Sequence, residues 1–466
     1  MKPISSEKLY ELSRILREKE AAPLFIVGGF IRNFLISDVA EGDLDIASAV
    51  PAERFAALAE EAGFNVVAFY KRTGTAVVKC GEEKYEYTAF RKELYSAGGG
   101  HTPAFTVPTD DIEEDARRRD FKCNAVYYDI FRGEITDVLG GVSDINNKIL
   151  DTVKAPEEVF ESDGLRLMRL ARLAGELDFR PTAETLAAAK KYSSNIADIS
   201  PERIFDELKR ILVADTKYDF SDKAGHYTGL KILSETHVLD GIIPELTAGR
   251  GMAQRADYHK YDVLEHSLKA VYYAEKEVRL AALFHDVAKP FCMLNYGEYY
   301  GHASVGEKMT ERILSALKAD GKTIKETAFL VGAHMKDLDC KEKESKIRRF
   351  IAENSPLIPK LLLLKQADYS ASKDDTGISP TVEKWQKIIE KMRSDGTPFS
   401  LKELNITAED LMAAGFKGGE IGKELKKLLA LCREFPERND REILLKKAEK
   451  DAEKSDEKRN KRSKRL

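Results

Sequence analysis

Two glycines followed by two closely spaced aspartates form the first group of residues that could do chemistry. Gly28 and Gly29 end an apolar, β-rich run and precede a segment with helical spacing from Phe30. Glycines let the backbone approach a ligand closely, and the free N–H groups of a helix start favour phosphate. Asp43 and Asp45 follow in GDLDIA, where strand character places positions i and i+2 on one face. These carboxylates could hold Mg²⁺, the hard cation that nucleotidyl transfer uses.

Each of these features also has a simpler interpretation. A glycine pair often only makes a tight turn, and a lone DxD is commonly a solvated turn. The predicted strand and turn ahead of the aspartates favour the metal site. Glu86, on the predicted strand of KYEYTAFR, could supply a third carboxylate or could be an exposed strand glutamate.

A second candidate group lies in the segment SDGLRLMRLAR. Asp163 and Arg166 are three residues apart and Arg169 follows three further on, so a continuous helix would present them on one face. An intrahelical ion pair explains this spacing, and recognition of a base explains it as well. Cytosine and adenine place an amine donor beside a ring-nitrogen acceptor, whereas uracil and guanine have a carbonyl in place of the amine. An aspartate beside an arginine would match only cytosine and adenine.

Histidines and aspartates in the second half of the chain form a third group. His266 lies in a predicted amphipathic helix, and the adjacent His285 and Asp286 end an apolar helical run. Imidazole and carboxylate side chains together are a common ligand set for divalent transition metals. Further candidates along the chain are His302, His334 and Asp368.

The elements that must position these residues are of two kinds. Up to about Pro156, β-rich runs alternate with helices and turns, whereas the remainder has apolar residues at three- and four-residue spacing. The pattern predicts an α+β protein, with a small mixed-sheet head followed by an all-helical neck, body and tail. With 466 residues, the chain is long enough for two to four domains of roughly 100–200 residues each.

Composition limits the class of protein. Hydrophobic residues make up 43% and charged residues 33%, and no run approaches the roughly 18 apolar residues of a membrane span, so we expect a cytoplasmic protein with no membrane partner. The net charge is −4, from 75 basic and 79 acidic residues, so any RNA-binding surface must be local. Residues 451–466 lack apolar periodicity and are expected to form a disordered basic tail, which could hold phosphates or simply be solvated.

Several ordered motifs then point to a family. GGFIRN, GDLDIA, YEYTAFR and EEDARRRDFKCNAVYYDI resemble the nucleotidyltransferases that include bacterial CCA-adding enzymes and poly(A) polymerases. The resemblance continues through EITDVLGGVSDI, FESDGLRLMRLARLAGELDF and SPERIFDELKRIL. It implies Mg²⁺ as cofactor and tRNA, CTP and ATP as partners. It also implies catalytic metal ligands (Asp43 and Asp45), triphosphate contacts (Gly28, Gly29 and Arg32), sugar contacts (Arg119 and Asp120) and a base-reading group (Asp163 and Arg166, followed by Arg169).

Two positions depart from the family's motifs. Ser162 stands where the family has a glutamate before the base-reading aspartate, and Asn33 stands where GGxVRD ends in aspartate. The metal and base-reading residues are intact. The motifs leave open whether the enzyme adds full CCA, only CC or only A.

The order of His266, His285, Asp286 and Asp368 resembles the HD-domain phosphohydrolases. The resemblance implies that these four are the core ligands, that His302 and His334 complete a second metal position, and that Ni²⁺, Co²⁺ or Mn²⁺ binds there. Such a module could hydrolyse phosphates or persist as an RNA-binding scaffold. The later segment DLMAAGFKGGEIGKELKKLLALC resembles the tail helices of CCA-adding enzymes, which would clasp the tRNA elbow.

The expected organisation is a nucleotidyltransferase head (1–145), a helical neck with the base-reading helix (146–250), an HD domain (251–370), a tRNA-binding helical tail (371–450) and the disordered basic tail (451–466). The expected function is protein-templated, metal-dependent addition of CCA to the tRNA 3′ end. The rival interpretations are a poly(A) polymerase and a phosphohydrolase whose head only binds RNA. Nothing in the residues indicates an oligomeric state.

Overall fold

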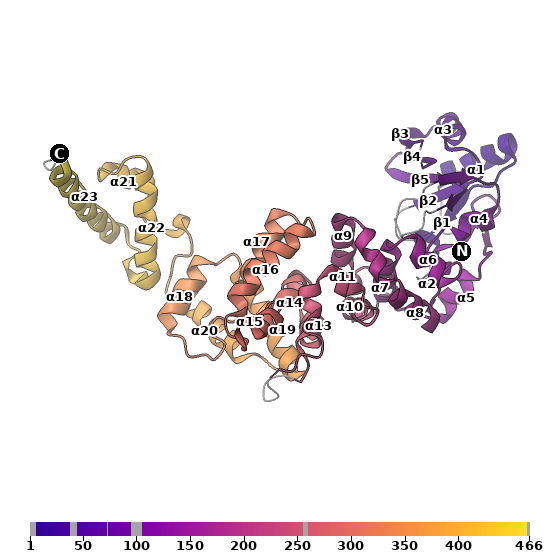
Figure 1. The fold of residues 1–466 in the computed structure, drawn as a ribbon. Coiled ribbons are helices and arrows are strands. Elements are labelled where there is room, and N and C mark those ends of the chain that lie inside the picture. Colours follow the sequence, from indigo (N-terminus) through magenta and orange to yellow (C-terminus); the bar gives the residue numbers. More distant parts are fainter. Residues whose placement is uncertain (1–5, 38–43, 72, 95–104, 255–259, 464–466) are drawn as a thin grey trace. The chain divides into compact units, whose positions relative to one another are not determined.

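The computed structural model describes residues 6–37, 44–71, 73–94, 105–254 and 260–463, with side chains up to residue 453 (Figure 1). Asp43, one of the two predicted catalytic metal ligands, lies outside these residues. The chain divides into two compact units. The first comprises Met1–Arg250 and Arg312–Gly321, and the second comprises Gly251–Glu311 and Lys322–Leu466.

The first unit contains a seven-stranded mixed sheet, as predicted for the head. Its strand order is β3-β4-β5-β2-β1-β8-β9, with β2 and β5 parallel and the other pairs antiparallel. A separate hairpin joins β6 (Arg91–Leu94) to β7 (Phe105–Pro108). The strands of the sheet are β1 (Phe25–Val27), β2 (Leu44–Ser48), β3 (Asn65–Tyr70), β4 (Thr75–Cys80), β5 (Glu83–Ala89), β8 (Tyr127–Asp129) and β9 (Glu134–Thr136).

The period of two along β5 separates core residues from surface residues. Tyr85 and Tyr87 are fully buried, and the Tyr87 ring stacks on Phe55 at a centroid distance of 3.6 Å. Phe55 belongs to α3 (Ala52–Glu61). Both α3 and α1 (Glu7–Glu20) lie beside the sheet (Figure 1). Because successive side chains of a strand point to opposite faces, this packing turns Glu86 outward.

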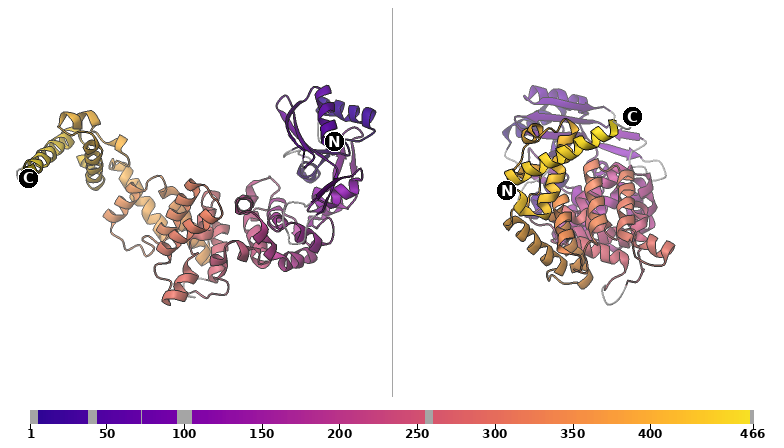
Figure 2. Two further views of the ribbon diagram at one scale, coloured as in Figure 1. Left: turned by 45° about the horizontal axis from the view of Figure 1, so that its top comes forward. Right: turned by 90° about the vertical axis from the view of Figure 1, so that its left-hand side faces the viewer.

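Helices make up most of the chain after the head, again as predicted. In both views of Figure 2 the strands, drawn as arrows, lie in the N-terminal part of the chain. In the neck, α7 (Leu165–Leu177) packs against α9 (Pro201–Ile211) and α10 (Gly225–Glu235). One short parallel pair, β10 (Ile149–Leu150) with β11 (Arg180–Pro181), departs from an all-helical neck. The neck also contains α6 (Pro156–Ser162), α8 (Ala183–Lys191), α11 (Val238–Ile242) and α12 (Pro244–Thr247), and the head contains α4 (Ile112–Arg117) and α5 (Gly141–Asn147).

The body is helical throughout the described residues, and α13 (Val263–Tyr273) packs against α14 (Arg279–Phe284) and α19 (Ile358–Lys373). None of the described helices is long and apolar enough to cross a membrane. The remaining helices are α15 (Lys289–Tyr296), α16 (His302–Ala316), α17 (Gly321–Ala333), α18 (Glu344–Glu353) and α20 (Pro380–Ser394).

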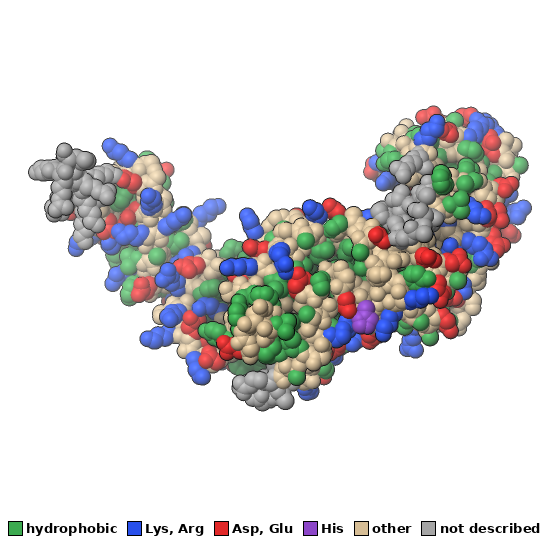
Figure 3. Space-filling view, viewed as in Figure 1, with side chains coloured by type: hydrophobic (Ala, Val, Ile, Leu, Met, Phe, Trp, Pro, Cys, Tyr) green, Lys and Arg blue, Asp and Glu red, His purple; other side chains and the backbone are tan. Residues whose placement is uncertain are grey.

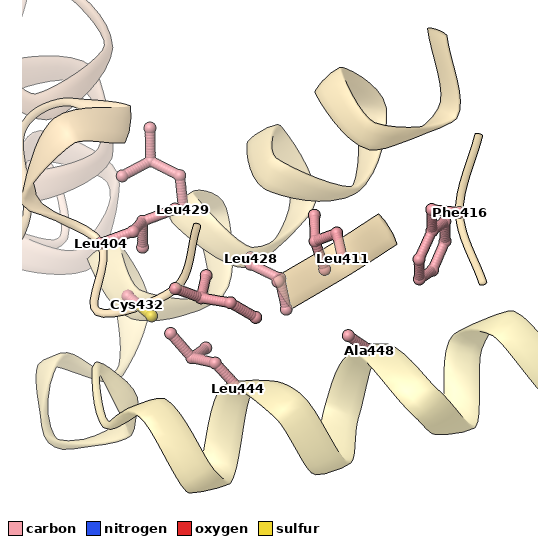
Figure 4. Close-up of a cluster of buried hydrophobic side chains, with 9 residues drawn as sticks. Leu404, Leu411, Phe416, Leu428, Leu429, Cys432, Leu444 and Ala448 are labelled. Carbon is pink, nitrogen blue, oxygen red and sulfur yellow. The ribbon is translucent and has the colours of Figure 1, made fainter. Parts of the chain in front are cut away.

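The tail has a small hydrophobic core of its own. Helices α21 (Ala408–Ala413), α22 (Gly419–Glu434) and α23 (Arg441–Ser463) enclose it, and Leu428 and Leu444 are fully buried there (Figure 4). A capping box starts α21, because the Thr407 hydroxyl accepts from the Asp410 amide while the Asp410 carboxylate accepts from the Thr407 amide.

The prediction that residues 451–466 are disordered is wrong for residues 451–463, which continue α23. The segment is rich in Lys, Glu, Arg and Ala, which are good helix formers. Helix growth is favourable once a nucleus exists, and the buried Leu444 and Ala448 anchor that nucleus in the tail core. Lys447 also pairs with Asp451 one turn later, at 2.5 Å.

Candidate active site and metal centre

The turn after β1 brings its backbone to the carboxylate of Asp45. β1 pairs with β2 so that Val27 lies opposite Asp45, and α2 (Gly29–Ser37) begins directly after Gly28. Gly28 has a φ of +85°, and a Cβ added there would lie 3.3 Å from Asp45 Oδ2. Any other residue would be strained and would crowd the carboxylate. The glycine turn, the helix start and one predicted metal ligand therefore share one small region.

A second carboxylate lies on the next strand. In the parallel register of β2 and β5, Asp45 is the partner of Glu86. Paired residues on neighbouring strands point to the same face of a sheet, so both side chains can approach one hard cation. Glu86 is exposed, and it is also the neighbour of Asp45. The position of Glu86 is thus compatible both with a third metal-binding carboxylate and with an ordinary exposed strand glutamate.

Arg32 is buried at the start of α2 and is held by two asparagines. Its Nη1 donates to Asn124 Oδ1 at 2.6 Å, and its Nη2 donates to Asn33 Oδ1 at 2.8 Å. Asn33 is the position where the resemblance would place an aspartate. An amide accepts these hydrogen bonds without neutralising the guanidinium, so Arg32 keeps a full charge for a phosphate.

Asp120 joins the head to the neck. Its Oδ1 accepts from Asn124 at 3.1 Å, and its Oδ2 accepts from Arg169 Nε, on α7, at 2.6 Å. Burial alone would raise the pKa of Asp120, but the charge of Arg169 and the amide of Asn124 hold it well below its usual range. Arg169 therefore pairs with the predicted sugar-contacting residue.

Asp115 is an organising residue that the sequence did not single out. It is fully buried on α4 and accepts hydrogen bonds from the Tyr127 hydroxyl at 2.7 Å, Arg118 Nε at 2.7 Å and Arg119 Nη2 at 3.2 Å. Arg119 also donates to the Tyr127 hydroxyl at 3.2 Å. Asp115 therefore fixes Arg119, the predicted sugar contact. Its position one helical turn before the arginines was the available signal, but an acid in a first helical turn is usually solvated.

The first unit contains a cavity of about 190 Å³ between residues of β6, α4 and α7. Arg166 of α7 reaches it, and most of its lining side chains are cationic, so it suits an anionic or strongly hydrogen-bonding ligand. The lining residues are Lys92, Glu93, Glu114, Arg117, Arg118, Lys154 and Arg166.

Asp163 and Arg166 do not lie on one continuous helix, so that prediction is wrong. Asp163 is an extended residue between α6 and α7, whereas Arg166 and Arg169 belong to α7. The interruption is at Asp163, with φ −151° and ψ 105°. The next residue, Gly164, lies close to a neighbouring segment, since an added Cβ would be 2.2 Å from the Asn195 carbonyl oxygen.

The two charged groups still lie together at the N-terminus of α7. Asp163 Oδ2 is 3.9 Å from Arg166 Nε, and Asp163 Oδ1 accepts from the Leu165 amide at 2.9 Å. Arg166 also donates to the carbonyl oxygen of Arg118 at 2.7 Å. An acceptor and a donor therefore stand side by side beside the cationic cavity.

In the second unit, His266, His285 and Asp368 converge. His266 Nε2 lies 3.0 Å from Asp368 Oδ1 and 3.1 Å from His285 Nε2. All three are candidate ligands of one metal ion. They come from α13, the end of α14 and α19, and the packing of α13 against both other helices brings them together.

A second candidate group contains Asp286, His302 and His334. Asp286 Oδ1 lies 3.2 Å from His302 Nε2, while its Oδ2 lies 3.2 Å from His285 Nε2. The structure therefore places Asp286 between the two groups, facing both, rather than among the ligands of the first group alone. This is the position of a carboxylate that could bridge two ions.

Three of the four histidines are oriented by their own helical turns. The Nδ1–H of His285 donates to the Ala282 carbonyl at 2.7 Å, that of His302 to Tyr299 at 2.8 Å, and that of His334 to Val331 at 2.6 Å. In its neutral form, each ring then directs the lone pair of Nε2 toward the centre. Burial and the neighbouring imidazoles lower the pKa of His334 to about 3, so this ring is neutral, as a metal ligand must be.

Charge at the centre also favours a cation. Burial alone would lower the pKa of His285, but the facing carboxylates of Asp286 and Asp368 raise it to about 10. Those carboxylates would favour a divalent ion for the same reason. The mixed imidazole and carboxylate donors, with their nitrogens already oriented, fit a divalent transition metal.

Comparisons with known proteins identify the family of the chain. Family models match three stretches: a poly A polymerase head domain at residues 24–151, a probable RNA and SrmB-binding site of polymerase A at 178–249, and an HD domain at 263–372. The CC-adding tRNA nucleotidyltransferase of Thermus thermophilus is 30% identical over 87% of this chain and 88% of its own length. The chain belongs to the tRNA nucleotidyltransferase family. The resemblance seen in the motifs is thereby confirmed.

Other members of the family support the same assignment. The A-adding tRNA nucleotidyltransferase of Deinococcus radiodurans is 31% identical over 75% of this chain and 76% of its own length. The fold matches the Bacillus stearothermophilus CCA-adding enzyme in complex with CTP, with a TM-score of 0.64 at 21% identity and 99% coverage of both chains. A Thermotoga maritima CCA-adding enzyme complexed with tRNA gives a TM-score of 0.60 at 16% identity, with 95% of each chain covered. This tRNA nucleotidyltransferase therefore has the fold of CCA-adding enzymes.

Proposed function

We propose that this tRNA nucleotidyltransferase completes the CCA end of tRNA from CTP and ATP with Mg²⁺. The observation that carries the proposal is the pairing of Asp163 and Arg166, 3.9 Å apart, beside the cationic cavity. An acceptor next to a donor selects cytosine and adenine, and these are the two bases that CCA contains. No nucleic-acid template is needed for that choice.

The residues of the head have three separate roles in the proposed transfer reaction: they bind the metal, the triphosphate and the nucleotide sugar. Asp45, Asp43 and Glu86 would hold Mg²⁺, which activates the attacking 3′-hydroxyl and neutralises the leaving pyrophosphate. Gly28, Gly29 and Arg32 would contact the triphosphate. Arg119, fixed by Asp115, and Asp120, fixed by Arg169, would lie against the nucleotide sugar. Positioning of this kind accounts for most of the catalysis of phosphoryl transfer.

Partial addition is the second candidate function. One observation favours it: the two curated relatives described above are an A-adding and a CC-adding enzyme, each of which completes part of the sequence. The Asp163–Arg166 pair accepts either base, so the base-reading group alone does not decide how many nucleotides are added.

The deciding experiment is sequencing of the 3′ ends made from tRNAs that end before CC, after the first C and after CC. With CTP and ATP together, we expect all three to end in CCA. Products that stop at CC, or extension of only the tRNA that already ends in CC, would replace the proposal by CC addition or A addition. Long adenylate tails on a generic RNA primer would instead identify a poly(A) polymerase.

We also infer that the histidine–aspartate centre hydrolyses phosphate esters. Its six ligand candidates fit two divalent ions, which would polarise the phosphate and activate water. Asp286, which faces both groups, would hold the pair of ions together. The fixed imidazoles would keep the geometry of the centre while a phosphate enters.

Replacing His285 with alanine should therefore remove hydrolysis of cyclic and terminal phosphates and lower the bound metal content. Nucleotide addition should stay largely intact, because the residues proposed for it belong to the first unit. Ring opening of a cyclic phosphate, phosphate release from a terminal phosphate and metal content should each be measured with Ni²⁺, Co²⁺ and Mn²⁺. His237→Ala is a matched control, since that histidine is 39% exposed and lies in the first unit. A wild-type protein that hydrolyses nothing with any of these ions would make the domain a scaffold.

A further inference from the structure

Four large apolar side chains are exposed together just after the His285–Asp286 pair. They lie on α15 and the loop that follows it: Phe291 is 41% exposed, Leu294 78%, Tyr296 60% and Tyr300 85%. Figure 3 shows hydrophobic side chains gathered over α15. Large apolar side chains exposed in one region often mark a binding surface. We call these four residues the aromatic shelf.

The aromatic shelf adjoins the candidate metal centre. The ring of Tyr299 lies 5.7 Å from Lys289 Nζ, and that ammonium is 2.7 Å from Asp286 Oδ2. The Tyr299 carbonyl also orients His302. Tyr300 is the next residue, so the most exposed ring of the shelf directly follows a residue that contacts the centre on two sides.

The rings of the shelf have the properties of a stacking platform. Phe291 and Tyr296 meet edge to face at 6.2 Å, which holds the Tyr296 ring in place while most of it remains exposed. Nucleobases stack on such rings with little dependence on sequence, because every base has a π face. A tyrosine beside a phosphate-binding centre is thus suited to a base attached to that phosphate.

We propose that the aromatic shelf stacks the unpaired bases at an RNA 3′ end while the histidine–aspartate centre engages the terminal phosphate. The inference rests on the proposed hydrolase function and specifies its substrate as the terminal nucleotide of a single-stranded RNA 3′ end. The family's RNA substrate makes an RNA end the fitting ligand.

Binding is the first test, because it does not depend on hydrolysis. The probe is a short single-stranded RNA with a 3′-phosphate and 2-aminopurine as its last base, titrated into the full chain with and without Ni²⁺. Stacking should quench the fluorescence. Tyr300→Ala should weaken binding about 5- to 150-fold, and Tyr300→Trp should bind within about twofold of wild type. Tyr300→Leu, which is apolar but not flat, should behave like alanine.

Base dependence is the second test. The wild type should hydrolyse the oligomer with a terminal adenosine 3′-phosphate faster than one with a terminal abasic ribose 3′-phosphate, and Tyr300→Ala should reduce that preference. Tyr70→Ala is the matched control, since Tyr70 is 55% exposed on the edge strand β3 of the other unit. It should change neither binding nor preference.

The outcomes separate the two proposals. If RNA binding depends on Tyr300 but no hydrolysis is found, the proposed hydrolase function is contradicted and the proposed RNA-binding role of the aromatic shelf is supported. If Tyr300→Ala leaves RNA binding and the preference for a terminal base unchanged, the proposed role of the aromatic shelf is contradicted. It is also contradicted if free adenosine 3′-monophosphate binds as tightly as the oligomer, since the ligand would then be a nucleotide rather than an RNA end. A dimer that Tyr300→Ala dissociates, with RNA binding unchanged, would instead make the patch an interface between copies.

Discussion

Replacing Asp45 with alanine should reduce nucleotide addition by about 100-fold or more, because catalysis of this transfer rests on charge stabilisation by the bound ions. Asp45 is the proposed ligand that lies against the glycine turn, where a Cβ on Gly28 would be 3.3 Å from its Oδ2, and it faces Glu86 in the register of β2 and β5. The measurement is the rate of incorporation of one CTP into a tRNA that lacks CCA. Asp43→Ala should have an effect of similar size.

Glu134→Ala provides the matched control for Asp45. It removes an exposed carboxylate from the edge strand β9 of the same sheet and should leave the rate unchanged. Both variants should unfold at nearly the wild-type temperature, since neither carboxylate contributes to the apolar core. An Asp45→Ala protein that extends tRNA at a near wild-type rate would remove Asp45 from the catalytic site.

Replacing Asp163 should change which nucleotides are used. Asp163→Ala should lower CTP and ATP incorporation together and narrow the gap to UTP, since a uracil carbonyl facing the carboxylate opposes two acceptors at a cost of about 1–3 kcal/mol. Asp163→Asn is the sharper variant, because it keeps an acceptor for the Leu165 amide and can offer a donor to uracil. UTP incorporation should therefore rise in Asp163→Asn. Single-nucleotide incorporation with each of the four NTPs measures both effects.

Asp178→Ala is the control for a purely structural effect on α7. Asp178 lies at the other end of that helix, where its exposed carboxylate pairs with Lys148, and its loss should leave nucleotide choice unchanged. If Asp163→Asn lowers all four nucleotides equally and CTP and ATP remain preferred to the same degree, then Asp163 only caps the helix and pairs with Arg166.

The sequence predicted the features that arise from local periodicity and spacing. The turn at Gly28 and the strand of Asp45 follow from an apolar run, a glycine pair and alternation, and each is determined within a few residues. The histidines could be assigned for a similar reason, because helical spacing and the adjacent His285 and Asp286 left few arrangements open. Family motifs supplied the remaining roles, which composition alone could not.

Tertiary packing decided what the sequence could not. The helix is interrupted at the extended Asp163, and the adjacent Gly164 packs closely against Asn195, a contact 31 residues away that helical spacing cannot reveal. From the sequence alone, Asp115 would be expected to be a solvated acid. In the structure it accepts hydrogen bonds from the Tyr127 hydroxyl and two arginines. Residues 451–463 look disordered in isolation but continue a helix that the tail core nucleates.

The hydrogen bonds from the Nδ1 atoms of His285, His302 and His334 have a consequence for how the domain acquires its ions. Each ring is fixed by a carbonyl three residues earlier on the same chain segment, so the orientation exists before any ion arrives. Zinc fingers differ, because their ligands are assembled by the metal and chelators unfold them. Here the apo domain should already be folded, and the ions should exchange with the surrounding pool without any refolding step. The metal in use would then reflect which ions the cell supplies, and could change with growth conditions while the protein stays the same.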